Sequence, residues 1–319
     1  MTASDLPRLR LTQLPTPLQR ARRFGDAIGA EVWIKRDDIG SIGLAGNKVR
    51  KLEFVLAEAV DQGHDTIVII GAEQSNAARA TAAACAQLGL RCVLVLSGDK
   101  PASPAGNLLL DGLFGADVQF AGDVGWAALW EESQRLSEEL RAQGASPYTL
   151  PAGASSPLGA CGFVNAWSEL REQGVEAESV YFASSSGGTH AGLLLGRTMT
   201  GAGPEPRAIG VAPDVVPDLP GYIAGLAAGA AELIGADVEI PRPEVDMGFI
   251  GEGYGIPTRD GVEAIRLLAR TEGIVCDPVY SGKALAALVA GEHRGPVVFW
   301  HTGGYHALFA PRYGDAVAP

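Results

Sequence analysis

Short apolar runs alternate with helical patterns along almost the whole of this 319-residue chain. The apolar runs lie at 32–34, 66–70, 92–96, 148–150, 180–183, 208–211 and 297–300. Helical spacing or Ala-rich composition marks 51–62, 76–88, 107–114, 131–143, 221–233, 261–270, 282–289 and a segment that starts at His190. Strands that alternate with helices predict an α/β fold with mostly parallel sheets covered by helices on both faces. Active sites in such folds lie at the carboxyl ends of the strands.

Charge and composition exclude several functional classes. A net charge of −12 and an isoelectric point near 4.9 argue against binding to a nucleic acid backbone. No apolar stretch approaches the roughly 18 residues of a membrane span, and the first residues lack the apolar core of a signal peptide, so we expect a cytoplasmic protein without a membrane partner. The cysteines and histidines show no metal-ligand spacing, so we expect no metal.

Lysine is scarce, and two of the five lysines, Lys48 and Lys51, lie in the segment Gly46–Glu53 at a predicted helix start. A lysine amine, unlike a guanidinium, can lose its proton and form a Schiff base. Cations at a helix N-terminus are electrostatically unfavourable, which favours a reactive amine or a helix start aimed at an anion. The alternative is an ordinary capped helix with a basic, solvated first turn.

Two strand-to-helix turns have the composition of anion sites. The turn Ser184–Thr189 is built from small residues, which let backbone N–H groups surround a phosphate at a helix N-terminus. The alternative there is an ordinary tight turn. In the segment Gly71–Asn76, Ser75 and Asn76 either cap the following helix or hold a substrate carboxylate with its exposed N–H groups, and the two interpretations are compatible.

Three polar turns lie in the second half of the chain. Glycines at alternate positions in Gly251–Pro257 give the backbone freedom to bring Tyr254 close to a ligand. The segments Asp277–Lys283 and His301–Gly304 place Tyr280, Ser281 and Thr302 near strand or helix ends. Taken one at a time, these turns favour a structural role.

Taken together and in order, six segments resemble one family. They are Asn47–Glu53, Gln74–Asn76, Gly188–Gly192, Gly253–Pro257, Asp277–Tyr280 and His301–Gly304. The chain is similar, from about Pro15 to Phe309, to the D-cysteine desulfhydrase and 1-aminocyclopropane-1-carboxylate (ACC) deaminase family. These are pyridoxal 5'-phosphate enzymes of fold type II, like the β subunit of tryptophan synthase. The resemblance implies two α/β lobes, a large one of residues 1–50 and 158–319 and a small one of residues 51–157, in a homodimer.

The resemblance also implies roles for matching residues. Lys48 would hold the cofactor as a Schiff base and move protons during catalysis. The expected catalytic residues are Lys48, Ser75, Tyr254 and Tyr280. The expected cofactor contacts are Lys48, Asn76, Ser186, Gly187, Gly188, Thr189, Tyr280, Ser281 and Thr302. The expected substrate contacts are Ser75, Asn76, Ala77 and Lys51. Because Lys48 must be partly neutral to react, we expect burial or the neighbouring cations Arg50 and Lys51 to lower the pKa of its amine.

Ser281 and Thr302 favour one activity within the family. The ACC deaminases resemble one another in having Glu and Leu at these two positions, whereas Ser and Thr are similar to the desulfhydrases. A carboxylate near the pyridine nitrogen would strengthen the cofactor as an electron sink, and elimination of a good leaving group needs less of a sink. We therefore expect α,β-elimination from a small amino acid, with D-cysteine giving pyruvate, ammonia and sulfide, and ACC deamination is disfavoured.

Several residues depart from the family pattern. Ala45, Ala77 and Ser185 stand where relatives usually have other residues, Tyr305 and His306 replace a usual Thr-Pro or Ser-Pro, and the loop 97–107 is shorter. Most of these positions lie around the substrate. L-cysteate sulfo-lyase activity, elimination or replacement on another β-substituted alanine, a degenerate pyridoxal-phosphate-binding protein and an unrelated α/β binding protein therefore stay open as alternatives.

Overall fold

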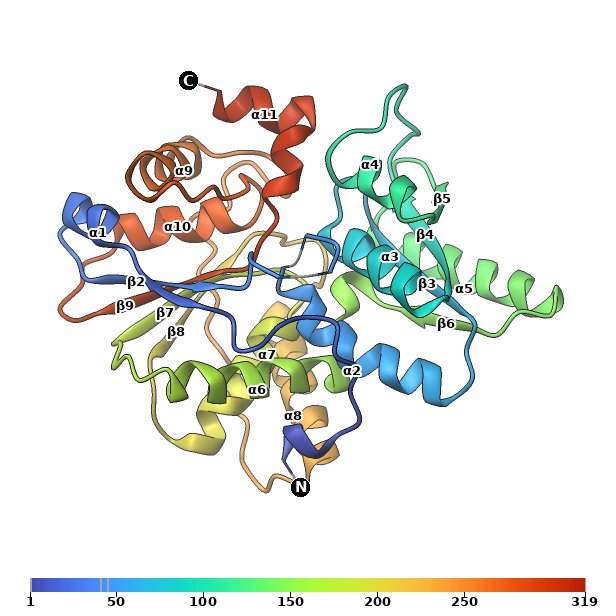
Figure 1. The fold of residues 1–319 in the computed structure, drawn as a ribbon, viewed down its shortest axis with the longest axis horizontal. Helices are drawn as coiled ribbons and strands as arrows, with labels where there is room; N and C mark the ends of the chain where they lie inside the picture. Colours follow the sequence, from blue (N-terminus) through green and yellow to red (C-terminus); the bar gives the residue numbers. More distant parts are fainter. Residues whose placement is uncertain (1, 41, 45, 319) are drawn as a thin grey trace.

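The computed structural model describes residues 2–40, 42–44 and 46–318, so Ala45 lies outside the described residues. Two lobes lie side by side, each built around one sheet (Figure 1). The helix α2 (Lys48–Asp61) runs between them. The two termini lie at opposite ends of the first lobe, the N-terminus beside α8 (Leu219–Ile234) and the C-terminus at α11 (Pro311–Val317).

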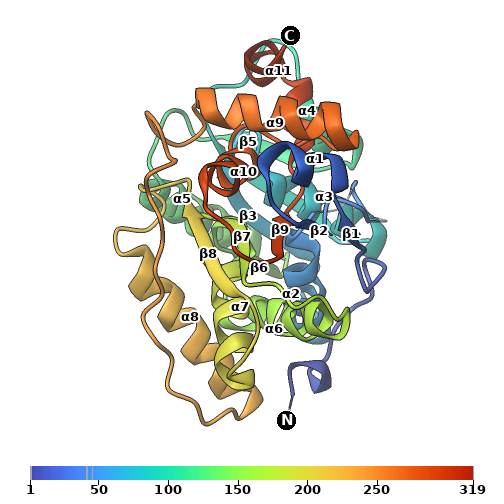
Figure 2. The same cartoon turned by 90° about the vertical axis from the view of Figure 1, so that its left-hand side faces the viewer.

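The first lobe contains a five-stranded sheet. Its order is β1 (Leu18–Arg20), β2 (Val32–Arg36), β9 (Val297–His301), β7 (Ser179–Ser184) and β8 (Glu205–Gly210). Only the β1–β2 pair in this sheet is antiparallel. Apolar side chains of α1 (Arg22–Ile28), α9 (Arg259–Glu272) and α10 (Ser281–Ala290) pack on one face. The other face is covered by α6 (Pro157–Glu172) and α7 (Gly188–Thr200), and Figure 2 shows the strands between the two sets of helices.

The second lobe contains a four-stranded parallel sheet. Its order is β5 (Asp117–Phe120), β4 (Arg91–Ser97), β3 (Thr66–Ala72) and β6 (Pro147–Leu150). The helices α2, α3 (Asn76–Leu88) and α4 (Gly106–Leu113) pack on one face, and α5 (Trp126–Ala142) packs on the other. Three short 3₁₀ helices, η1 (Ala3–Asp5), η2 (Ala152–Ala154) and η3 (Tyr305–Phe309), join these elements.

The alternating pattern predicted the architecture correctly: both sheets are parallel apart from β1, and both are covered by helices. All of the predicted strands and helices are present, with boundaries shifted by a few residues. The largest shift is at α5, which begins at Trp126 rather than at residue 131. The sequence did not predict β1, α1, β5, α6 or α11. No helix in the described part of the chain is both long and apolar enough to cross a bilayer.

The sequence did not predict α6 because its apolar residues show no clear helical period. Small residues on α6 lie against two neighbouring helices, so no single apolar stripe is visible in the sequence. A Cβ on Gly162 would lie 2.2 Å from the carbonyl oxygen of Arg50 in α2, and a Cβ on Gly192 in α7 would lie 2.2 Å from that of Ala160. Close helix contact therefore requires these glycines. The remaining signal was Ser156, whose Oγ caps the helix by accepting from the Gly159 N–H at 3.0 Å, followed by a proline.

Candidate active site

The carboxyl ends of β3, β7 and β9 open onto one cavity between the lobes. The cavity brings together most of the residues predicted from the sequence: Lys48, Ser75, Asn76, Ala77, Ser186, Gly187, Thr189, Tyr254, Tyr280 and Thr302. Lys51, Gly188 and Ser281 do not line it and lie behind its wall.

Lys48 is the first residue of α2, and its side chain is partly exposed to the cavity. Its Nζ donates to Oδ1 of Asn47 at 2.9 Å, and Nδ2 of Asn47 donates to Oγ1 of Thr189 at 2.9 Å. Burial lowers the pKa of the Lys48 amine to about 8, Asp277 opposes this shift, and Arg79 adds to it. A substantial fraction of the amine is therefore neutral near pH 8, as a nucleophile requires. The sequence did not single out Asn47, which orients the amine.

The turn between β7 and α7 forms a cradle of backbone and hydroxyl groups. Gly187 has a φ of 79°, which favours glycine. Oγ of Ser155 donates to Oγ of Ser186 at 2.9 Å and accepts from the Gly188 N–H at 3.2 Å. A Cβ on Gly153 would lie 2.1 Å from Oγ of Ser186, so a larger residue would push into the cradle. Such a turn at the start of a helix suits a phosphate group.

Lys51 places a buried amine beneath this cradle. Its side chain is buried, and Nζ donates to Oγ of Ser155 at 3.0 Å. Burial lowers the pKa of its amine well below the ordinary value, and the charge of Lys48 adds to the effect. No carboxylate of a described residue raises that pKa, so a phosphate on the cradle would supply the opposite charge that the protein itself does not. Direct contact between Lys51 and a substrate stays a prediction.

The start of α3 lies at the other end of the cavity. Ser75 caps the helix, its Oγ accepting from the Ala78 N–H at 3.1 Å. Oδ1 of Asn76 accepts from Nδ2 of Asn107 at 2.9 Å, which leaves the Asn76 amide nitrogen as the donor for other groups. Asn107 is fully buried and comes from α4. The sequence did not predict this positioning role for Asn107. The N–H groups at this helix start suit a substrate carboxylate.

Two tyrosines form the wall beside Lys48. The hydroxyls of Tyr254 and Tyr280 are hydrogen-bonded to each other. Burial raises the pKa of Tyr254 to about 12 and raises the pKa of Tyr280 well above its ordinary value. Both hydroxyls are therefore protonated at neutral pH, and one of them can donate a proton or hydrogen bond to a group beside the reacting carbon.

Asp277 is a second residue whose role the sequence did not predict. It is fully buried, and its carboxylate accepts from the N–H groups of Val279, Tyr280 and Ser281 at 2.9, 2.7 and 3.0 Å. The Ser281 hydroxyl donates to the same carboxylate. From the sequence, Ser281 presents a neutral hydroxyl where the ACC deaminases have a carboxylate. The structure adds a carboxylate directly behind it, so the contrast with the Glu of the ACC deaminases is weaker than the sequence suggested.

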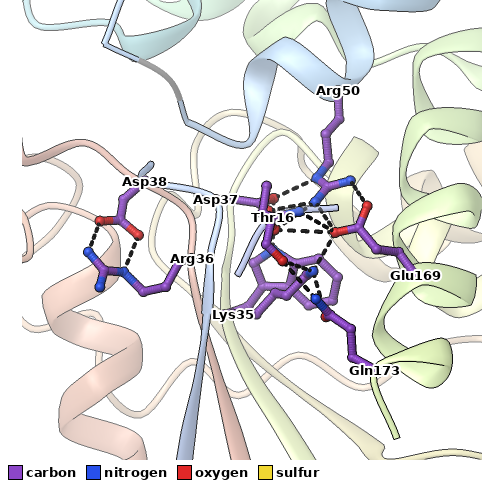
Figure 3. Close-up of polar contacts among 9 residues, drawn as sticks. Thr16, Lys35, Arg36, Asp37, Asp38, Arg50, Glu169 and Gln173 are labelled. Carbon is purple, nitrogen blue, oxygen red and sulfur yellow. Dashed lines mark hydrogen bonds and ion pairs between the residues drawn. The ribbon is translucent and has the colours of Figure 1, made fainter. Parts of the chain in front are cut away.

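Arg50 belongs to a separate buried network, shown in Figure 3. Its guanidinium donates to Asp37 at 2.8 and 2.9 Å and to Glu169 at 2.9 and 3.0 Å. Lys35 donates to Glu169 and, at 2.7 Å, to Gln173. Burial raises the pKa of the Glu169 carboxyl, but Arg50 and Lys35 outweigh it and hold that pKa at about 2.

The expectation that Arg50 lowers the pKa of Lys48 is therefore wrong. Burial and Arg79 lower that pKa, whereas the charge of Arg50 is neutralised by the two carboxylates on its own side of α2. Arg79 lies on α3 and is buried, so the cation that lowers the pKa of Lys48 comes from another helix.

The model of the family described as pyridoxal-phosphate dependent enzymes matches residues 9–303. The chain belongs to this family. The solved structure of an ACC deaminase homologue is 37% identical with a TM-score of 0.92, over 98% of this chain and 96% of that one. An L-serine ammonia-lyase from Rhizomucor miehei (16% identity, TM-score 0.65, 92% and 94% coverage) shares the fold. A hydrogen sulfide-producing enzyme from Fusobacterium nucleatum also shares the fold, with 18% identity and a TM-score of 0.61 over 95% of this chain and 95% of that one.

The family uses pyridoxal 5'-phosphate, and the residues present fit that cofactor. Lys48 would bind its aldehyde, because the amine opens onto the cavity and is partly neutral. The cradle of Ser186, Gly187 and Thr189 would bind its phosphate, with Lys51 behind. The fold is that of a fold type II pyridoxal-phosphate enzyme, as the resemblance predicted.

Proposed function

We propose that this pyridoxal-phosphate enzyme catalyses α,β-elimination of a small β-substituted amino acid, with D-cysteine giving pyruvate, ammonia and sulfide. The observation that carries the proposal is the arrangement around one cavity. A partly neutral Lys48 amine, the carboxylate-binding start of α3 and a protonated tyrosine pair all line it. The hydroxyls at Ser281 and Thr302, in place of the Glu and Leu of the ACC deaminases, favour elimination over ring opening.

When bound, the cofactor stabilises negative charge at the α-carbon of the substrate. Ser75 and the backbone N–H groups of Asn76 and Ala77 hold the substrate carboxylate, which fixes the α-carbon beside Lys48. Nζ of Lys48 removes the α-proton. The bond from the β-carbon to its substituent then breaks, the substituent leaves with the bonding electrons, and a double bond forms between the α- and β-carbons. Water converts the released enamine to pyruvate and ammonia.

Tyr254 and Tyr280 assist the departure of the β-substituent. Because both hydroxyls stay protonated at neutral pH, one can donate a hydrogen bond to a departing thiolate while it accepts the hydrogen bond of the other. Asp277 fixes the backbone around Tyr280 through its two bonds to Val279 and Tyr280, so it acts on this step by positioning.

Ring opening of ACC is the second candidate. Two observations favour it: the 37% identity to an ACC deaminase homologue over nearly the full length of both chains, and the Asp277 carboxylate behind Ser281. Its product is α-ketobutyrate rather than pyruvate, so one assay separates the two candidates.

The test is a product screen with the purified, cofactor-loaded enzyme. D-cysteine, L-cysteine, L-cysteate, ACC and β-chloroalanine of both hands are offered, and pyruvate and α-ketobutyrate are measured. We expect pyruvate from D-cysteine and β-chloroalanine. Dominant α-ketobutyrate from ACC would favour the second candidate. Pyruvate and sulfite from L-cysteate would identify a sulfo-lyase, and bound cofactor without any product would identify a degenerate binding protein.

We also propose that the enzyme is a cytoplasmic homodimer. Leu113 on α4 and Phe309 on η3 are 72% and 75% exposed, and the two elements contact each other. Such exposed apolar side chains suit a surface covered by a second copy. Light scattering tests the proposal: a dimer mass that falls to a monomer mass in Leu113→Glu supports it, and a wild-type monomer contradicts it.

A further inference from the structure

A second, larger cavity adjoins the cofactor cavity, with a free volume of about 570 Å³ against about 60 Å³ for the first. Trp126, Tyr254 and Tyr280 line both cavities and so form the wall between them. None of the roles derived so far uses this second space. Because it lies behind Tyr254 and Tyr280, this second space is next to the part of the first cavity where the substrate would react.

The shared wall is built from both lobes. Trp126 is the first residue of α5 in the second lobe, whereas Tyr254 and Tyr280 belong to the first lobe. The rings of Trp126 and Tyr254 meet edge-to-face with centroids 6.0 Å apart, and those of Tyr254 and Tyr280 do the same at 6.0 Å. Tyr254 and Tyr280 are hydrogen-bonded to each other, so replacing either one disturbs the other. Trp126 is the residue of the wall that can be replaced without breaking this hydrogen bond.

With the substrate carboxylate at the start of α3 and the cofactor phosphate in the β7–α7 turn, the substrate's β-carbon would face this wall. One end is the start of α3, which suits the carboxylate, and the floor is the phosphate cradle of the β7–α7 turn. Lys48 takes the α-proton from its own side. The aromatic wall is the boundary left for the third substituent of the α-carbon, and a β-substituent longer than a thiol reaches the second cavity only past Trp126.

The lining of the second cavity favours neutral, apolar substituents. Behind the wall lie Val124, Leu129 and Val279, together with Tyr313. The charged side chains are Glu73, Asp123 and Arg312, which sum to a negative charge and disfavour an anionic group such as a sulfonate.

We infer that Trp126 determines substrate specificity by limiting the size of the β-substituent, and that the second cavity is the site for an aryl or alkyl substituent once that limit is relieved. The inference rests on the proposed elimination. It makes Trp126 a steric boundary rather than a catalytic residue, so its removal changes which substrates are used and leaves the chemistry of small ones in place.

The test compares Trp126→Ala with Trp130→Ala. Trp130 lies on the same helix, is 38% exposed and lines neither cavity, so it controls for loss of an indole from α5. For each protein, kcat/KM is measured by pyruvate release from β-chloroalanine and from S-benzylcysteine, in both hands. We expect Trp126→Ala to raise the S-benzylcysteine to β-chloroalanine ratio about tenfold or more, chiefly through KM, and Trp130→Ala to leave it unchanged.

An unchanged ratio in a folded Trp126→Ala enzyme that still uses β-chloroalanine would overturn the inference. So would a wild-type enzyme that already uses both substrates equally. If the alanine variant does not fold, Trp126→Phe provides the same comparison, because it opens a smaller passage between the two cavities. Failure of the elimination itself is distinguishable, because the wild type then releases no pyruvate from either compound. S-benzylcysteine binding, read from the visible absorbance of the bound cofactor, still shows in that case whether Trp126 limits size.

Discussion

The two sides of α2 handle buried positive charge in opposite ways. Arg50 lies between the carboxylates of Asp37 and Glu169, and these partners raise its pKa despite burial. Lys48 and Lys51 lie in the first turns of the same helix, and among the described residues each is hydrogen-bonded to a neutral oxygen, that of Asn47 and that of Ser155. Burial lowers the pKa of both amines.

The difference separates a structural cation from reactive ones. Burying a charge costs free energy unless an opposite charge and hydrogen bonds compensate. Arg50 is compensated within the protein, so it stays charged and connects β2, α2 and α6. Lys51 has no carboxylate partner among the described residues, and Lys48 is affected by the charge of Asp277 without an ion pair, so both amines are held nearer to neutrality until an anionic ligand arrives. Burial alone does not identify a functional cation, because Lys283 is also buried, donates to the carbonyl oxygens of Ile250 and Gly253, and does not line the cavity.

Replacing Lys48 is the strongest test of the side of α2 that faces the cavity. In Lys48→Ala the cofactor loses its covalent attachment and the substrate loses its base, so we expect at least a roughly 1000-fold fall in kcat/KM and loss of the visible absorbance band. Lys100→Ala is the matched control, because Lys100 is an exposed lysine outside the cavity. Equal effects of the two substitutions would remove Lys48 from the mechanism.

Replacing Arg50 tests the structural side. Arg50→Met leaves Asp37 and Glu169 buried without their main partner, and we expect about 3–5 kcal/mol lower stability in urea or thermal unfolding. A variant as stable as the wild type would mean that the network in Figure 3 contributes little.

The same network predicts a pH dependence. The pKa of Glu169 is held at about 2, below its ordinary value of 4.5, so its contribution to stability is present above about pH 4.5 and is lost as the pH falls toward 2. In Arg50→Met, acid unfolding should begin at a higher pH than in the wild type, as measured by circular dichroism. Identical acid transitions would contradict this assignment.

Replacing Lys51 should have the smallest effect on folding and a selective effect on the cofactor. Lys51→Met removes a buried amine that has no carboxylate partner among the described residues, so we expect stability within about 1 kcal/mol of the wild type. Cofactor affinity should fall about 10- to 100-fold because the phosphate loses a nearby cation. A stability loss as large as that of Arg50→Met would erase the contrast between the two sides of α2.

The sequence was sufficient for the parts that depend on local pattern and ordered motifs. Apolar runs predicted the strands of the described residues except β1 and β5, and the motif residues Lys48, Ser75, Ser186 and Tyr280 meet at one cavity. What the sequence lacked were contacts between distant residues. Asn107 orients Asn76 across 31 positions, and Glu169 pairs with Arg50 across 119. No local spacing predicts such pairs. For this reason the sequence wrongly predicted that Arg50 lowers the pKa of Lys48, when it pairs with Asp37 and Glu169.

Asp277 and Trp126 were missed for different reasons. Asp277 stands inside a motif that was noticed, but its role is to accept backbone hydrogen bonds, which depends on the fold of the turn. Trp126 stands at a helix start that the charge pattern placed five residues later, and only the packing of the two lobes brings it against Tyr254.

Burial without a hydrogen-bonded carboxylate makes Lys48 a reactive amine. The most direct measurement is the rate at which cofactor-free enzyme forms its visible band with added pyridoxal 5'-phosphate, followed between about pH 6.5 and 10.5, with Lys48→Ala as the background. Only the neutral amine attacks the aldehyde. Because the pKa of Lys48 is lowered to about 8, the rate should reach half of its maximum near pH 8 and level off above about pH 9. A rate that keeps rising toward pH 10, as for an ordinary lysine, would contradict the account.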